Sequence, residues 1–256
     1  KKKGRRNKEN MGYHESLTEG RNAVLEAFRS GKTVDRLFVL DGCQDGPVKT
    51  ILREAKKQDT MVQYVKKERL DQLSETKNHQ GVIAYCAACE YAEVSDILEN
   101  AKKKGEAPFI VLLDGIEDPH NLGAIIRTAN QAGAHGVIIP KRRAVGLTAT
   151  VARTSAGAVN YTPVAKVTNL VTVMEDLKKE GMWFVCADMD GEEMYSLNLK
   201  GPIGLVIGNE GEGVSRLVKE HCDMVASIPM KGDIDSLNAS VAMGVLAYEI
   251  VRQRRF

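Results

Sequence analysis

The sequence lacks any apolar run long enough to cross a lipid bilayer, although 43% of its 256 residues are hydrophobic. No apolar segment of the kind found in secretory signals follows its opening basic residues. These absences argue against a membrane protein, and we expect a chain that is not exported. The charged fraction of 27% is typical of a globular protein that folds in water.

Cysteine is scarce, and the five cysteines are an odd number scattered along the chain, which argues against a disulfide framework. This usage is typical of a reducing compartment, so we expect a cytoplasmic protein. Cys86 and Cys89 form a CxxC pair in a strand-like stretch, but no second Cys or His pair follows that would complete a zinc site. We therefore expect buried thiols and no metal.

The histidines likewise show no catalytic pattern, because none is combined with a serine or cysteine nucleophile in a recognisable motif. We expect structural roles for them, and only one stands beside a candidate site residue. They are His14, His79, His120, His135 and His221.

The sequence has little excess charge of either sign, since the formal net charge is only +2. Its distribution is uneven, however: a basic arm at residues 1–16 opens the chain, and Arg252, Arg254 and Arg255 close it. Such blocks are usually solvated arms, and nucleic-acid contact is their commonest function. A solubilising tail explains the charge equally well.

Two α/β domains are expected from the pattern of hydrophobic residues. Residues 17–91 alternate short helical and strand-like stretches, and residues 92–107, with a short helix, are interpreted as a linker. In residues 108–256 the apolar runs are longer and do not alternate, which is typical of parallel strands covered on both faces. We predict a doubly wound sheet of about six strands, with helices at 121–132, 147–157, 168–180, 213–221 and 238–253.

Ligands of such sheets bind at the carboxyl ends of the strands, and three polar clusters occur at these places. The first runs from Asp118 to Gly133, where Asp118 and Asn121 suit a helix start. Arg127 is six residues after Asn121, about 240° around the helix, so the two side chains do not share a side. Gly123, one turn before Arg127, is expected to leave room for the guanidinium. A helix cap and a surface arginine are the simpler explanation of each residue alone.

The second cluster is the strand-to-helix turn Gly208, Asn209, Glu210, Gly211, Glu212 and Gly213. Three glycines indicate backbone that comes close to a ligand or adopts a positive φ. The turn is not a P-loop, because it lacks Gly-Lys-Ser/Thr, and its two glutamates would repel a pyrophosphate. A tight turn with solvated acids is the simpler explanation, but a neutral or cationic ligand accounts better for the acids.

The third cluster places Ser236, Asn238 and Ser240 at the start of a long helix. Capping that helix requires one such residue, so three within five positions indicate a hydrogen-bonding pocket. We expect the helix to use an apolar stripe of Leu237, Val241, Val245 and Tyr248.

Taken together, the clusters resemble the three motifs of a known enzyme family. Asn121 with Arg127, the turn around Glu210, and the loop with Ser236 and Asn238 are similar, in order and separation, to the motifs of the SpoU (TrmH-type) RNA ribose 2′-O-methyltransferases of the SPOUT superfamily. The stretches "GRNAVLEAF" and "HQGVIAY" are similar to the small ribosomal-protein-like α/β domain that many members carry before the catalytic domain.

This resemblance implies a C-terminal α/β SPOUT domain with a parallel sheet and a deep trefoil knot, formed where the C-terminal chain passes through a preceding loop. Knots are rare exceptions to the rules for chain connections, so hydrophobic periodicity does not predict one. The resemblance also implies a homodimer with the active site at the subunit interface.

The implied activity is S-adenosylmethionine-dependent methyl transfer to a ribose 2′-hydroxyl of structured RNA. The likeness is strongest to family members that methylate a guanosine of 23S rRNA. A tRNA substrate is the alternative, as is a catalytically silent RNA-binding protein of the same fold. A nicotinamide-dependent dehydrogenase is disfavoured because GxGxxG is missing after the first long strand.

The resemblance also assigns the site residues. We expect Arg127 to stay charged, since a neutral arginine at pH 7 costs about 7 kcal/mol, and to stabilise the nascent alkoxide while gripping a phosphate. Glu210 would hold its loop and contact Arg127, and residues 1–91 would select the RNA. The implied catalytic residues are Arg127, Asn121, Glu210, Ser236 and Asn238. The implied cofactor-binding residues are Ala187, Ile207, Gly208, Ile228, Met230, Leu237 and Ser240.

Overall fold

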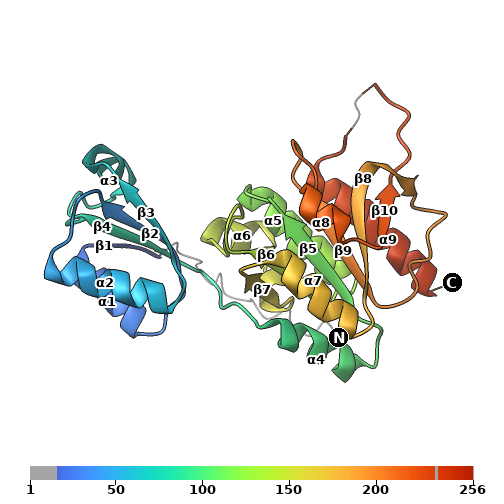
Figure 1. Cartoon of the computed structure of the whole chain (residues 1–256), viewed down its shortest axis with the longest axis horizontal. Helices are drawn as coiled ribbons and strands as arrows, with labels where there is room; N and C mark the ends of the chain where they lie inside the picture. Colours follow the sequence, from blue (N-terminus) through green and yellow to red (C-terminus); the bar gives the residue numbers. More distant parts are fainter. Residues whose placement is uncertain (1–15, 234–235, 256) are drawn as a thin grey trace, which may run out of the picture.

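The chain folds into two α/β units, which lie side by side in Figure 1. The structure is a computed structural model that describes residues 16–233 and 236–255, so the basic arm assigned to residues 1–16 lies outside the described residues except for Ser16. Within the described ranges, no helix has the length and apolar character needed to span a membrane.

The N-terminal unit is a four-stranded sheet in the order β1-β4-β2-β3. The β2–β3 pair is parallel and the other two pairs are antiparallel. Two helices cover one face and a third covers the other. The first strand, which the sequence pattern did not indicate, pairs with the last. The elements are β1 (Ser16–Glu19), α1 (Arg21–Arg29), β2 (Val34–Leu40), α2 (Gly46–Lys57), β3 (Met61–Val65), α3 (Lys67–Leu73) and β4 (Val82–Cys86).

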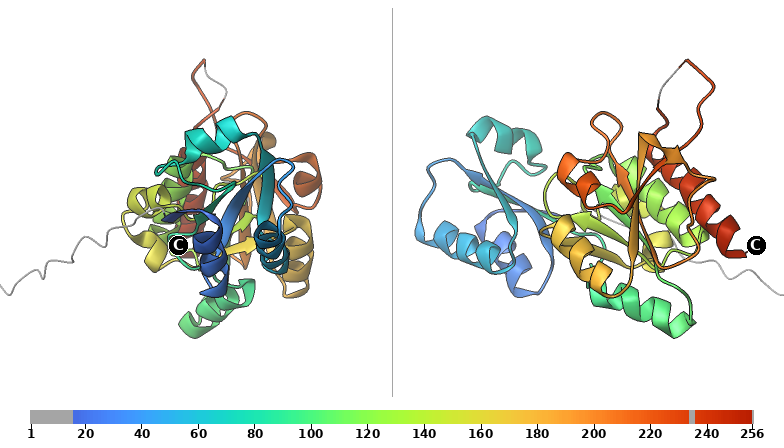
Figure 2. Two further views of the ribbon diagram at one scale, coloured as in Figure 1. Left: turned by 90° about the vertical axis from the view of Figure 1, so that its left-hand side faces the viewer. Right: turned by 45° about the vertical axis from the view of Figure 1, so that its right-hand side comes forward.

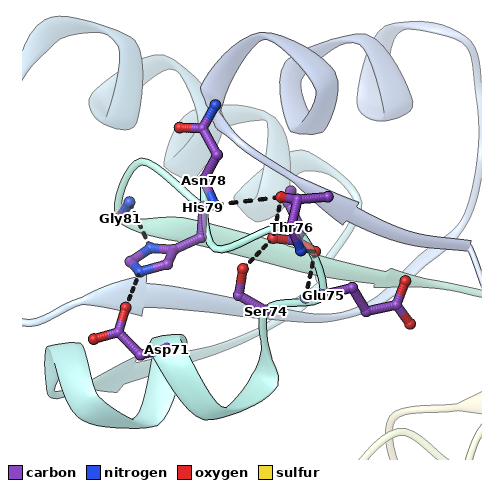
Figure 3. Close-up of polar contacts among 8 residues, drawn as sticks. Asp71, Ser74, Glu75, Thr76, Asn78, His79 and Gly81 are labelled. Carbon is purple, nitrogen blue, oxygen red and sulfur yellow. Dashed lines mark hydrogen bonds and ion pairs between the residues drawn. The ribbon is translucent and has the colours of Figure 1, made fainter.

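Polar contacts hold the turn between α3 and β4 (Figure 3). The Glu19 carboxylate accepts hydrogen bonds from Ser74, Glu75 and Thr76. His79 Nδ1 accepts the Gly81 amide hydrogen at 3.0 Å, so Nε2 carries the proton that His79 shares with the Asp71 carboxylate, also at 3.0 Å. The structural role expected for His79 is confirmed.

The C-terminal unit is a six-stranded sheet in the order β10-β8-β9-β5-β6-β7, and every neighbouring pair is parallel. The predicted parallel sheet is therefore confirmed. Its strands are β5 (Phe109–Asp114), β6 (Gly136–Pro140), β7 (Val164–Val167), β8 (Trp183–Glu193), β9 (Ile203–Gly208) and β10 (Met224–Ser227). Its helices are α4 (Val94–Lys104), α5 (Pro119–Gln131), α6 (Ala149–Thr154), α7 (Leu170–Lys179), α8 (Arg216–Glu220) and α9 (Ala239–Arg255). The helix expected at 147–157 is shorter, and a 3-10 turn, Ala158–Asn160, follows it.

Both faces of this sheet are covered by helices, as the rotated views in Figure 2 show. Alternate side chains of β5 point to opposite faces: Val111 and Leu113 pack with α5, α6 and α9, whereas Ile110 and Leu112 pack with α4, α7 and α8. Burial on both sides explains why the strand sequences show no polar alternation.

The stretch interpreted as a linker contains α4, whose Ile97 is fully buried against the C-terminal sheet. A side chain at Gly136 would bring its Cβ within 2.5 Å of Ile97 Cγ1, so the glycine in β6 permits this close packing. His135 lies next to this contact and is also buried; its Nδ1 accepts the Phe109 amide hydrogen and its Nε2 lies 3.0 Å from Glu106. The joining stretch is thus anchored to the second unit.

An ion pair joins the two units. Lys166 Nζ of β7 lies 2.5 Å from the Asp35 carboxylate of β2, and both side chains are largely shielded from solvent. The Tyr91 hydroxyl donates to the same carboxylate at 2.9 Å. Burial, together with the negative charge of Asp35, raises the pKa of Tyr91 well above its ordinary value. These contacts tie the start of β2 to the edge strand of the C-terminal sheet.

The last helix, α9, buries a different face from the one that we predicted. Met243, Leu246 and Ile250 pack into the core, whereas Val241 and Tyr248 of the predicted stripe are 49% and 51% exposed. Both faces of the helix are apolar, so the sequence pattern alone did not distinguish them.

The closing arginines belong to α9 and not to a solvated arm. Arg252 forms an ion pair with Glu249 at 2.7 Å. Arg254 donates to three backbone carbonyls, and burial lowers its pKa. The expectation of a free basic block at this end is therefore wrong for these two residues.

Candidate functional site

The three polar clusters meet at the carboxyl edge of the C-terminal sheet. Asn121 Nδ2, from the first turn of α5, donates to Glu210 Oε1 in the turn after β9. Asn238 Nδ2, from the residue before α9, donates to Asn121 Oδ1 at 3.0 Å and to Glu210 Oε1 at 3.1 Å. Segments separated by up to 117 residues therefore share one hydrogen-bonded cluster, which we call the amide–carboxylate cluster: Asn121, Glu210 and Asn238.

Ser240 fixes the orientation of the Asn238 amide. Its backbone N–H and its hydroxyl both donate to Asn238 Oδ1, at 3.0 Å and 2.6 Å. With its oxygen so occupied, Asn238 must present its NH₂ group to Asn121 and Glu210. Two of the three small polar residues at this helix start thus act together, while Ser236 is exposed and forms no hydrogen bond with a residue of the described ranges.

The turn that carries Glu210 is shaped by its own residues. Asn209 Oδ1 accepts the amide hydrogens of Gly211, at 2.9 Å, and Glu212, at 2.6 Å. Gly213 has a φ of 69°, which favours glycine. A Cβ on Gly208 would lie 2.0 Å from the Gly213 carbonyl carbon. The predicted positive φ therefore occurs at Gly213, whereas the close neighbour of Gly208 in the structure is the chain's own backbone and not a ligand.

Asp114 fastens this turn to the neighbouring strand, a role that our reading of the sequence missed. Its Oδ2 accepts the Ser215 amide hydrogen at 2.8 Å. Next to it, Gly115 has a φ of 79°, and a Cβ there would lie 2.9 Å from Asn209 Nδ2. The available signal was a carboxylate at the end of the buried run "FIVLLD".

Arg127 lies on the exposed flank of α5, whereas Asn121 is only 8% exposed. The two residues thus differ in environment, as expected from their separation around the helix. Within the part of the chain that the structure describes, the Arg127 side chain forms no hydrogen bond or ion pair. The expected contact with Glu210 is absent among these residues: both cluster amides donate to Glu210 Oε1, and Arg127 lies on a different side of α5 from Asn121.

Gly123 serves helix packing and does not make room for Arg127, contrary to our expectation. It is buried, and a Cβ there would lie 1.8 Å from Thr154 Oγ1 and 2.7 Å from Thr154 Cβ. Thr154 also donates to the Pro119 carbonyl at 3.3 Å. The glycine therefore lets α6 approach the first turns of α5.

The residues proposed for the cofactor gather along the same edge. β8 leaves its regular pairing with β10 between Cys186 and Glu192, and this excursion begins at Ala187. Asp188 within it accepts from Lys219 at 2.7 Å. Burial acts to raise the pKa of Asp188, but hydrogen bonds from Lys219 and the Asp190 amide outweigh it, so the pKa is lowered. Ala187 lies within β8, where its irregular stretch begins. At or just after the ends of β9 and β10 and around the start of α9 are Ile207, Gly208, Ile228, Met230, Leu237 and Ser240.

The composition of this edge suits S-adenosylmethionine. Ile207 is buried, whereas Ile228 and Leu237 are half-buried, so parts of their apolar side chains are open to a ligand. The carboxylate of Glu210 suits a sulfonium cation nearby. Among residues 16–233 and 236–255, no group of three or more His, Cys, Asp or Glu side chains could hold a metal ion, and Cys86 of the CxxC pair is buried.

Comparison with known proteins establishes the family. The model of the SpoU rRNA Methylase family matches residues 108–248, more than half of the chain, and a model described as RNA 2′-O ribose methyltransferase substrate binding matches residues 17–92. The chain belongs to the SpoU methyltransferase family. It is thus an S-adenosylmethionine-dependent RNA methyltransferase.

Relatives of this SpoU methyltransferase match along nearly their whole length. YacO of Bacillus subtilis, named as a TrmH family tRNA/rRNA methyltransferase, is 49% identical over 246 residues, which cover 95% of this chain and 98% of YacO. A TrmH family tRNA/rRNA methyltransferase of Staphylococcus saprophyticus is 45% identical over 243 residues, covering 94% and 97%.

Solved structures agree with this assignment. The SpoU methyltransferase AviRb from Streptomyces viridochromogenes, in complex with AdoMet, superposes with a TM-score of 0.60 at 28% identity, covering 98% of this chain and 95% of AviRb. An AdoMet-bound rRNA methyltransferase from Sinorhizobium meliloti gives a TM-score of 0.58 at 25% identity, covering 92% and 86%.

Proposed function

We propose that this SpoU methyltransferase methylates the ribose 2′-hydroxyl of a guanosine in 23S rRNA. The observation that carries the proposal is the amide–carboxylate cluster, which assembles the three motifs at one edge of the sheet beside the helix that bears Arg127. The match to a 2′-O ribose substrate-binding domain supports the ribose as acceptor. The likeness noted from the sequence supports the guanosine of 23S rRNA.

S-adenosylmethionine supplies an electrophilic methyl group, and the remaining difficulty is the weak nucleophilicity of a ribose hydroxyl. Arginine is effectively always protonated at neutral pH, so Arg127 acts as a cation. It stabilises the developing negative charge on the 2′-oxygen and holds a neighbouring phosphate, while the proton leaves to that phosphate or to water. The Arg127 guanidinium, which forms no hydrogen bond or ion pair with a residue that the structure describes, is available for this role.

The amide–carboxylate cluster positions the parts of the site. By joining α5, the Glu210 turn and the start of α9, it fixes the distance between the helix of Arg127 and the residues proposed to hold the cofactor. Ser236 lines the same loop and shapes the pocket. The seven residues named above would hold the cofactor, and the Ser240 hydroxyl donates to Asn238 Oδ1.

The active form is a homodimer, and the exposed face of α9 supports this. Val241 and Tyr248 are about half exposed and Val245 is half-buried, so the face adjoining the Asn238 loop offers apolar surface to a second copy. We further propose that the chain threads the trefoil knot expected for the family and that the protein is cytoplasmic, as the odd number of cysteines favours.

A tRNA substrate is the second candidate, because the curated relatives carry names that include both tRNA and rRNA. A catalytically silent RNA-binding protein is disfavoured by the complete hydrogen-bonded cluster, which RNA binding alone does not require.

The test uses methyl-labelled S-adenosylmethionine with 23S rRNA and tRNA transcripts. Alkali cleaves RNA through the 2′-oxygen, so a 2′-O-methyl group leaves the label in an alkali-resistant dinucleotide. We expect such dinucleotides beginning with guanosine from 23S rRNA. Label in mononucleotides would show base methylation and overturn the ribose assignment, and label confined to tRNA would overturn the substrate. Absence of transfer to either RNA would support a silent protein.

A further inference from the structure

The loop between β6 and α6, residues 141–148, is held by both units of the protein. At its start, Lys141 Nζ lies 2.6 Å from the Asp59 carboxylate of the N-terminal unit. The hydrogen bond from Lys141 lowers the pKa of Asp59. The Lys141 amide also donates to the Val167 carbonyl of β7 at 2.8 Å. The first residue of the loop therefore joins β7 to the turn between α2 and β3 of the N-terminal unit.

The end of the loop is fixed against the joining region. The Leu147 amide donates to the Tyr91 hydroxyl at 2.8 Å, and the Leu147 carbonyl accepts the Ala88 amide hydrogen at 2.7 Å. A Cβ on Gly146 would lie 2.3 Å from Asp35 Oδ2. The loop thus presses against the Asp35–Tyr91–Lys166 contact that joins the units.

The middle of the loop touches the segment that leads to the functional site. The Val145 amide donates to the Ile116 carbonyl at 3.0 Å, and Ile116 lies between β5 and the helix that carries Asn121 and Arg127. The three anchors fix the loop between the RNA substrate-binding domain and the amide–carboxylate cluster.

Two arginines of this loop make none of the contacts that anchor it. Arg142 and Arg143 are exposed, and neither forms a hydrogen bond or ion pair with a residue of the described chain. Arg143 also has a φ of 54°, a left-handed backbone conformation that residues other than glycine seldom adopt. Such conformations persist where the surrounding structure imposes them, and they are enriched at ligand-binding positions.

We propose that Arg142 and Arg143 form a phosphate-binding site that guides the RNA backbone from the substrate-binding domain to the methyl-transfer site. The guanidinium fork matches the oxygens of a phosphodiester, and a loop held at three places presents two such forks with little further ordering. The proposal rests on the proposed function only in taking RNA as the ligand. Solvated arginines are the alternative, but they would not require a constrained backbone between three anchors.

The size of the effect follows from counterion release. Each phosphate contact contributes roughly 0.7 to 0.9 to the slope of log affinity against log salt, so losing two contacts lowers the slope by about 1.4 to 1.8. At 0.1 M salt this corresponds to a dissociation constant raised by roughly 25- to 60-fold.

The experiment measures binding of 23S rRNA transcripts over a range of KCl concentrations. Arg142→Ala/Arg143→Ala is compared with Lys103→Ala/Lys179→Ala, which removes two exposed cations from α4 and α7, outside the RNA substrate-binding domain, and changes the net charge equally. We expect the first variant to lose affinity and slope as calculated and the control to change less than threefold. S-adenosylmethionine binding, measured by calorimetry, and the melting temperature should stay at their wild-type values in both.

Arg142→Lys/Arg143→Lys separates charge from the guanidinium fork, and we expect it to recover most of the slope but only part of the affinity. Equal affinity losses in the alanine variant and the control would overturn the proposal, as would an unchanged slope in the alanine variant. If the wild-type protein transfers no methyl group to RNA, the proposed function fails. If it does so and the alanine variant binds normally, only the loop assignment fails.

Discussion

Replacing Glu210 tests whether the amide–carboxylate cluster holds the site together. Glu210 Oε1 accepts from Asn121 and from Asn238, and alanine removes both hydrogen bonds. Hydrogen bonds to a charged group contribute about 1.5–3 kcal/mol each, but Glu210 is an exposed residue and water replaces part of that. We therefore assign about 1 kcal/mol to each bond and about 2 kcal/mol to the pair.

The two hydrogen bonds hold three segments of the site in place, so their loss should lower the rate of methyl transfer. About 2 kcal/mol corresponds to roughly a 30-fold decrease in kcat/KM. Glu210→Gln keeps an acceptor oxygen and loses the charge, so we expect a decrease of roughly fivefold, or about 1 kcal/mol. Glu212→Ala is the matched control, because this exposed acid in the same turn forms no side-chain hydrogen bond with a described residue.

The assay is transfer of labelled methyl groups to 23S rRNA at subsaturating RNA, together with thermal unfolding of each variant. A wild-type kcat/KM for Glu210→Ala would refute the reasoning. So would an equal decrease in Glu212→Ala, because charge near the turn would then matter more than the hydrogen bonds.

Three further changes probe the fold. Gly123→Ala should lower the free energy of unfolding by about 2–3 kcal/mol, because the added methyl group clashes with Thr154. Gly46→Ala, at a position with open space around it, should change the free energy of unfolding by less than about 0.5 kcal/mol. Urea titration measures both values, and equal values would contradict the packing argument. Burial lowers the pKa of His135, so this side chain binds its proton at a higher pH in the unfolded chain than in the folded protein. The contribution of neutral His135 to the free energy of unfolding is therefore complete above about pH 6.5 and is lost as the pH falls below that value. Urea titrations at pH 7.5 and 5.0 should show a smaller pH dependence for His135→Gln than for the wild type, and an identical dependence would exclude His135 as its source. Asp35→Asn leaves Lys166 without its ionic partner. Limited proteolysis should therefore cut the variant between the units several times faster than the wild type, while the affinity for the cofactor stays the same. Protease resistance equal to that of the wild type would show that the ion pair does not fasten the units.

The parallel sheet and the meeting of the three clusters could be predicted from the sequence because each depends on short-range patterns. Uninterrupted apolar runs such as "FIVLLD" require burial on both faces, and polar residues after several parallel strands must gather at one edge. The sequence therefore predicts the residues of the amide–carboxylate cluster, although not their individual hydrogen bonds.

Other features depend on which distant residues come into contact. The sequence of α9 is apolar on two faces, and only its packing against α5 shows that Met243 and Leu246 are buried while Tyr248 is exposed. The role of Gly123 follows from Thr154, 31 residues away along the chain. Likewise, nothing near Asp35 in the sequence indicates that it pairs with Lys166.

The most direct test of the account replaces Arg127 itself. Arg127→Ala and Arg127→Lys are compared with the wild type for transfer of labelled methyl groups into alkali-resistant dinucleotides of 23S rRNA, and calorimetry measures S-adenosylmethionine binding in the same preparations. We predict a loss of at least about 100-fold in transfer for Arg127→Ala, as expected when a group that stabilises developing charge is removed, with cofactor affinity within twofold of wild type. Transfer at the wild-type rate in Arg127→Ala would contradict the assignment of Arg127 to the reaction.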